Sequence, residues 1–143
     1  MGRRRGRSTI EGFGALDRTF ARIPDAVEPE RVEELLLRNA KPLVDDMEAR
    51  APRLSGDLAA SAMAGKELSP RQAALHRKKS DVEVFAGMGP LPQAITQEFG
   101  TFKEPPQPTV RPAWDANKRR IFDSVARDVA EEIDRAATKG GRR

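Results

Sequence analysis

The sequence of 143 residues contains no cysteine, one histidine and few aromatic residues. Without cysteine it can form neither a disulfide framework nor a thiolate metal site. The aromatic share of 5% leaves few large side chains to fill an interior, so we expect a thin core that partner subunits complete. No run approaches the roughly 20 consecutive apolar residues that a membrane helix needs, and the start lacks the apolar stretch of a signal peptide. We therefore expect no membrane span and no secretion.

Positive charge is concentrated at the two ends of the chain. The formal net charge is +4, whereas seven cationic residues lie at the ends, so the body between them is mildly acidic. These residues are Arg3, Arg4, Arg5, Arg7, Lys139, Arg142 and Arg143. Residues 1–8 contain too little apolar surface to become ordered alone. We therefore divide the chain into a flexible arm at 1–8, a single domain at 9–138 and a basic tail at 139–143.

Apolar residues recur at helical spacing in three segments. Residues 13–23 predict a short helix, and residues 29–51 predict a longer amphipathic one. Pro42 lies inside the second pattern and predicts either a kink near 38–41 or two helices in succession. A third helix is predicted over 113–138, where two glycines then end the pattern.

Short elements are predicted between the two long helices. Residues 51–57 are rich in turn-forming types, and 58–66 predict a helical turn that merges into a strand. The polar and basic residues 69–80 predict a loop or hairpin connection that projects outward. Residues 81–87 alternate polar with apolar side chains and predict the clearest strand in the chain.

A proline-rich run follows a short element at 94–99, which Gly100 closes. The prolines of this run are Pro105, Pro106, Pro108 and Pro112. They lie so close together that neither a helix nor a central strand is tolerated, which predicts an extended arm. Such an arm is stiff and can reach a neighbouring subunit at a low ordering cost.

Residues that could support catalysis are scarce. His76 is the only available histidine base, and its three basic neighbours favour the neutral imidazole. Gly65 and Lys66 suggest a phosphate-binding loop, but Ala60 and Glu67 stand where that motif needs a glycine and a hydroxyl. We therefore expect a protein that is not an enzyme and that binds no cofactor.

Three further features have a functional and a plainer interpretation. The carboxylates Asp45, Asp46 and Glu48 could bind a metal, but acidic residues on the outer face of a helix are usually solvated. The basic cluster of Arg71, Arg77, Lys78 and Lys79 could contact phosphates, although no aromatic residue among them could stack on bases. Trp114 could line a peptide groove, but a lone tryptophan that starts an amphipathic helix is more often core or interface.

Three segments stand in a specific order along the chain. Residues 51–61 contain Ala-Pro, then Ser-Gly, then Leu and Ser; residues 97–101 read Gln-Glu-Phe-Gly-Thr; and residues 108–113 read Pro-Thr-Val-Arg-Pro-Ala. Together they resemble the tail-completion or head-tail joining family of long-tailed double-stranded DNA bacteriophages, also described as neck or minor tail proteins. The resemblance covers residues 9–137, and it departs at Thr109 and Val110, where the family has Phe-Leu.

The resemblance implies an α+β fold, with a small antiparallel sheet packed by long N-terminal and C-terminal helices. It also implies a structural protein of the virion neck, assembled in the host cytoplasm, which forms a hexameric ring at the head-proximal end of the tail. The implied partners are other copies of the chain, the tail-tube protein, the head-closing connector protein and genomic DNA in the lumen.

Two sets of site residues follow from this resemblance. Interface residues are expected at Glu98, Phe99, Gly100, Thr101, Pro108, Arg111, Pro112 and Trp114. A structural turn is expected at Pro52, Ser55, Gly56 and Leu58. Arg111 is well placed for a bidentate carboxylate contact, within the chain or across the ring.

A nucleic-acid-binding accessory protein is the alternative hypothesis. It would use the basic ends and the 71–79 loop, with DNA contacts at Arg3, Arg4, Arg5, Arg7, Arg77, Lys78 and Lys79. The two hypotheses differ in the salt dependence of DNA affinity and in its loss when residues 1–7 are deleted.

Overall fold

A computed structural model describes residues 27–53 and 56–140 of the chain. The predicted helix at 13–23, the cations at residues 3–7 and Ser55 lie outside these residues. Across the described ranges, every helix is too short or too polar to span a membrane.

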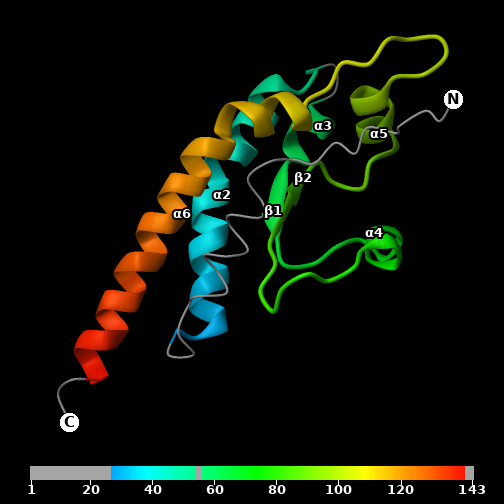
Figure 1. The fold of residues 1–143 in the computed structure, drawn as a ribbon. Helices are drawn as coiled ribbons and strands as arrows, with labels where there is room; N and C mark the ends of the chain where they lie inside the picture. The colour runs from blue at the N-terminus through cyan, green and yellow to red at the C-terminus, as the bar shows by residue number, and fades with distance from the viewer. Residues whose placement is uncertain (1–26, 54–55, 141–143) are drawn as a thin grey trace, which may run out of the picture.

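Two long helices and a two-stranded sheet form the main body (Figure 1). In chain order the elements are α2 Pro29–Arg50, α3 Asp57–Ala60, β1 Met63–Gly65, α4 Pro70–Leu75, β2 Phe85–Gly87, α5 Pro92–Phe99 and α6 Val110–Gly140. Helices α2 and α6 pack on each other, and the sheet packs on α2. This arrangement confirms the predicted α+β class, and α3 followed by β1 confirms the predicted turn that merges into a strand.

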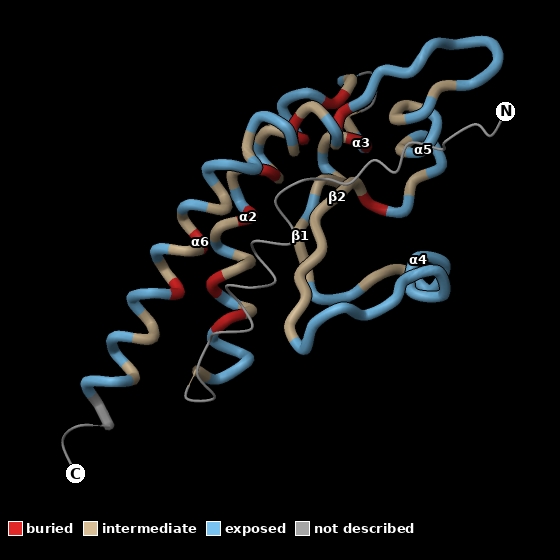
Figure 2. Tube along the Cα trace, viewed as in Figure 1, coloured by how far each residue is buried: buried red, intermediate tan, exposed pale blue. Residues whose placement is uncertain are grey.

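The buried core lies between α2 and α6, which run side by side (Figure 2). One cluster consists of Leu35, Val125 and Val129, and the other of Leu43, Met47 and Ala113. Met47 is 0% exposed and is the largest fully buried side chain of the described residues. Alanines occupy several of the other buried positions, so the core is thin, as the low aromatic content predicts.

Helix α2 runs without interruption from Pro29 to Arg50 and includes Pro42. Of the two alternatives predicted for Pro42, two successive helices is therefore wrong, and a kink near 38–41 stays a prediction. A proline inside a helix removes one backbone hydrogen bond, but the apolar stripe on both sides of Pro42 packs against α6 and keeps the segment helical.

Helix α6 begins at Val110, three residues before the predicted start. Pro112 therefore lies in the first turn of α6, and its assignment to the extended arm was wrong. The first N–H groups of a helix have no carbonyl partner within that helix, so a proline there costs no hydrogen bond. The arm itself spans residues 101–109, which form neither helix nor strand.

The two strands pair antiparallel, with Ala64 opposite Ala86, and the long connection between them contains α4. Residues 69–80 thus form the predicted hairpin connection, although a short helix replaces a plain loop. The predicted strand at 81–87 is reduced to Phe85–Gly87. Residues 81–84 have no strand opposite them, because residues 66–69 of the other arm leave the strand conformation before α4 begins.

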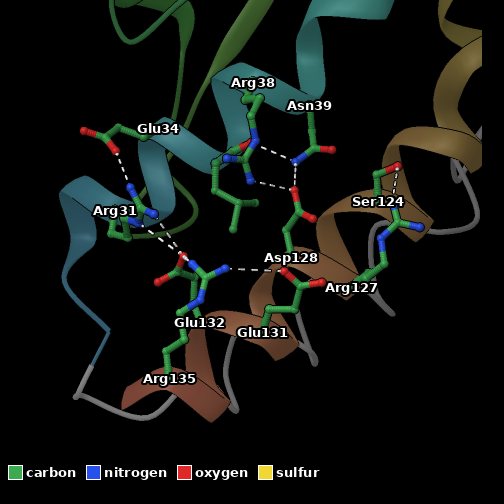
Figure 3. Close-up of polar contacts among 11 residues, drawn as sticks. Arg31, Glu34, Arg38, Asn39, Ser124, Arg127, Asp128, Glu131, Glu132 and Arg135 are labelled. Carbon is green, nitrogen blue, oxygen red and sulfur yellow. Dashed lines mark hydrogen bonds and ion pairs between the residues drawn. The ribbon is translucent and has the colours of Figure 1, made fainter. Parts of the chain in front are cut away.

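A line of polar contacts joins α2 to α6 beside the core (Figure 3). Asn39 Nδ2 donates to Asp128 Oδ2 at 2.8 Å, and Arg38 Nη2 donates to the same oxygen at 2.9 Å. These two hydrogen bonds hold the pKa of Asp128 below its ordinary value, and the one from Asn39 has the larger effect. Arg31 forms a second cross-helix ion pair, with Glu132, at 3.2 Å.

Candidate subunit interface

The predicted interface residues fall on three successive parts of the chain: the end of α5, the arm at 101–109 and the first turns of α6 (Figure 1). Helix α5 begins at Pro92, two residues before the predicted element, because a proline is tolerated in the first turn. It ends at Phe99, directly before Gly100, as predicted.

The carboxylate of Glu98 caps the start of α6. Glu98 Oε2 accepts hydrogen bonds from the backbone N–H groups of Thr109 at 2.8 Å and Val110 at 3.0 Å, and Oε1 accepts from that of Arg111 at 3.0 Å. Partial burial raises the pKa of this carboxyl group, but the three backbone hydrogen bonds and the nearby Arg111 charge outweigh burial and lower the pKa. Glu98 is therefore a charged helix cap supplied from another helix.

The residues at the start of α6 explain why this cap comes from α5. Thr109 precedes the helix, where a threonine side chain normally accepts a hydrogen bond from the second or third helical N–H. The second N–H, of Arg111, is bonded to Glu98, and the third residue is Pro112, which has no N–H. Thr109 is 2% exposed, and its Oγ1 has no hydrogen-bond partner in the described chain. Glu98 thus performs the capping that Thr109 cannot.

Gly100 allows the arm to fold back on α5. It has φ +72°, and a Cβ at this position would lie 2.7 Å from Pro106 N and 2.9 Å from the Glu104 carbonyl oxygen. Thr101 N–H donates to the same Glu104 oxygen at 2.9 Å, and Gln107 N–H donates to the Gln97 carbonyl at 2.8 Å. The arm is therefore held at several points between Glu98 and the start of α6.

This tied segment presents large apolar side chains to solvent. Phe99 is 68% exposed, Phe102 is 94% exposed, and Ile95 on α5 is also exposed. The Nζ atom of Lys103 lies 5.3 Å from the centre of the Phe102 ring. Phe102 was missed in the sequence analysis, although its place directly after Gly-Thr in a polar arm was a signal for it. We call Ile95, Phe99 and Phe102 the apolar loop patch.

The other expected interface residues differ in exposure. Pro108 and Arg111 are exposed, and Pro112 is half-buried. Arg111 forms no ion pair with a carboxylate of the described residues, and a contact across subunits stays a prediction. Trp114 packs against the second core cluster, which contains Met47.

The expected structural turn precedes β1 and lies at the same end of the sheet as the segment that leads from β2 to α5. Gly56 has φ +79° and precedes α3, Leu58 is buried, and Pro52 is half-buried. Ser61, directly after α3, accepts a hydrogen bond on its carbonyl oxygen from Gly89 N–H at 2.9 Å. This contact joins the end of α3 to the segment that follows β2.

The expected DNA contacts Arg77, Lys78 and Lys79 lie exposed on the hairpin next to His76. His76 Nε2 lies 2.7 Å from Glu83 Oε2, a carboxylate that the sequence analysis did not pair with it. The Lys79 N–H, the His76 ring and the Ser80 N–H hold the pKa of Glu83 below its ordinary value. These contacts close the far end of the hairpin.

The described residues contain no group of three or more acidic or histidine side chains that could hold a metal ion. Asp45 and Asp46 instead pair along α2 with Lys41 and Arg50, both at 2.9 Å. The candidate site is therefore the segment at 95–102, where Phe99 and Phe102 are exposed. No family model, no curated protein and no solved structure matches the chain.

Proposed function

We propose that this chain is a structural protein of a phage neck, one copy of a ring that completes the tail tube at its head-proximal end and joins it to the head connector. The sequence segments 51–61, 97–101 and 108–113, in this order along the chain, support this proposal through their resemblance to neck proteins. The α+β arrangement agrees with it.

The apolar loop patch is the observation that carries the proposal. Exposed phenylalanines are costly in water unless another surface covers them. Here they lie on a segment that Glu98 and Gly100 hold in place, so little conformational entropy is lost when a partner binds. A preorganised apolar surface is suited to contact between proteins, and the segment is the one for which the resemblance implies an interface.

A mass measurement tests the proposal. The full chain is examined by light scattering, alone and mixed with the tail-tube protein of the same phage, beside the variant Phe102→Ser. We expect a ring-sized species with wild type in at least one condition and its loss with the variant. Met63→Ser is the matched control, since Met63 is also exposed but lies on β1. A monomer in both conditions would refute a ring protein.

DNA binding is a second candidate function, and one observation favours it. Arg77, Lys78 and Lys79 are exposed and form no ion pair in the described part of the chain. Affinity for duplex DNA that falls steeply with salt, and that disappears on deletion of residues 1–7, would support this function. Absence of such affinity in a chain that still assembles would exclude it.

A further inference from the structure

Helix α4 stands at the tip of the hairpin, and all six of its residues are exposed. A helix this short is marginal in water, because few hydrogen bonds offset the cost of nucleation. Ser69 and Gln72 form a capping box at its start, yet Leu75 at its end is 82% exposed. The capping box thus holds the turn that presents the apolar side chain of Leu75 to solvent.

Positive charge predominates at this tip, although Asp81 lies exposed beside it and Glu83 contacts the His76 ring. Arg71, Arg77, Lys78 and Lys79 lie in or beside α4, and the stretch from Ser69 to Ser80 contains no acidic residue. None of these four cations forms an ion pair in the described chain. A surface that covers α4 should therefore be acidic and partly apolar.

The start of α2 has the complementary character. Glu28, Glu30 and Glu34 are exposed there, and the neighbouring Pro29 adds exposed apolar surface. Glu28 and Glu30 form no ion pair within the described ranges, and Glu34 pairs only with Arg31 in its own helix. We call these three carboxylates the acidic start of α2.

Inside one molecule the two surfaces stay apart. The hairpin carries α4 away from both long helices, and the start of α2 lies on another side of the molecule (Figure 1). Beside the acidic start of α2, Glu33 instead pairs with Lys66, the residue that follows β1.

We propose that the hairpin tip of one copy docks on the acidic start of α2 in a second copy. The two surfaces differ, so the contact is head-to-tail and leaves one of each free for the next copy, as in a ring or a filament. The inference rests on the proposed function and adds to it a second interface, separate from the apolar loop patch.

A second copy fits this tip better than nucleic acid does. Phosphates would neutralise the cations but would leave Leu75 uncovered. Residues 69–80 also contain no aromatic side chain on which bases could stack. Protein that is both acidic and apolar satisfies both features of the tip.

Charge reversal tests the contact in the full chain. One variant carries Arg77→Glu, Lys78→Glu and Lys79→Glu; a second carries Glu28→Lys, Glu30→Lys and Glu34→Lys. Sedimentation at about 50 mM salt, where screening is weak, should show self-association of the wild type weakened more than about tenfold in either variant. The matched control for the first variant makes the same charge change at exposed residues of α6: Lys118→Glu, Arg119→Glu and Arg120→Glu. This control should associate like wild type.

Mixing provides the decisive result. The first variant offers an acidic tip and an acidic start, and the second a basic tip and a basic start. An equimolar mixture should therefore associate again, as should one chain that carries all six reversals. Restored association cannot come from misfolded variants. The docking proposal is overturned if neither the mixture nor the chain with six reversals associates. It is also overturned if each triple variant alone associates like wild type.

The outcomes separate this inference from the proposed function. A wild-type chain that forms no multimer, alone or with tail-tube protein, refutes both. A ring that persists in the charge-reversal variants but is lost with Phe102→Ser refutes the hairpin contact alone. Unchanged mass together with lost affinity for a duplex DNA oligonucleotide in the first variant would assign the tip to DNA.

Discussion

Glu98 is the residue on which the geometry of the apolar loop patch depends. Glutamine in its place keeps the size but loses the charge, and it turns an amide NH₂ group toward backbone N–H groups that need an acceptor. We expect Glu98→Gln to lower the free energy of unfolding at pH 7 by about 1–2 kcal/mol in urea denaturation.

The effect of this substitution should depend on pH. The pKa of Glu98 is lowered in the folded chain, so its carboxylate stabilises the fold above the ordinary pKa of 4.5. That contribution is lost as the pH falls through the lower, folded-state pKa. The difference in unfolding free energy between wild type and Glu98→Gln should therefore shrink as the pH is taken from neutral to about 3. A difference that stays constant over this range would contradict the role of the charge.

Gly100 gives a second prediction at this scale. Its φ of +72° is unfavourable for other residues, and a Cβ would lie within 3 Å of backbone atoms of Pro106 and Glu104. Gly100→Ala should therefore destabilise the fold by about 2–3 kcal/mol in the same assay. Gly87→Ala is the control, because a Cβ there meets nothing within 4 Å and the change should cost nothing. Equal losses of unfolding free energy in Gly100→Ala and Gly87→Ala would contradict the expected strain of a side chain at Gly100.

At the scale of elements, Glu83 closes the hairpin that carries α4. Its Oε1 accepts from the Lys79 N–H at 2.7 Å, while Oε2 lies 2.7 Å from the His76 ring. Glu83→Ala should speed hydrogen exchange of the Lys79 amide and leave exchange in α2 and α6 unchanged. Asp81→Ala, a nearby exposed carboxylate, is the control. Faster exchange throughout α2 and α6 as well would mean that the hairpin is not an independent unit.

The long helices could be predicted from the sequence because their apolar spacing is local. The errors arose where tertiary contacts override local preference. Pro42 stays inside α2 because α6 packs on both halves of the helix. Pro112 lies in the first turn of α6, which begins at Val110, because that turn needs no N–H there. The alternating residues 81–87 form only a short strand, because register and length depend on a partner strand that the pattern does not specify.

The segment proposed as an interface could be selected from the sequence, but the hydrogen bonds that hold it could not. The resemblance directed attention to 97–101 and 108–113, yet nothing in the spacing showed that Glu98 bonds to the backbone at 109–111. Capping rules apply to neighbours in sequence, and here the cap comes from the preceding helix. Pairs such as Asn39 with Asp128 are likewise remote in sequence and depend on the packing of α2 against α6.

At the scale of the whole molecule, a thin core is combined with an exposed apolar loop patch. The buried clusters contain few large side chains, whereas Phe99 and Phe102 are exposed on the surface. If the proposed assembly forms, part of the apolar surface that could stabilise the chain is buried only then. Ligand binding to the folded state alone raises stability by about 2.7 kcal/mol at a hundredfold excess over Kd, and self-association acts in the same way.

The unfolding temperature of the wild type should therefore rise with protein concentration, by several degrees once the chain associates, as measured by scanning calorimetry. Phe102→Ser should remove this dependence without lowering the unfolding temperature of the dilute chain, because a side chain that is 94% exposed contributes little to the monomer. A variant that is less stable even when dilute would place Phe102 in the fold of the monomer. If the unfolding temperature of the wild type is independent of concentration, the apolar loop patch does not mediate self-association. Its partner would then be another protein.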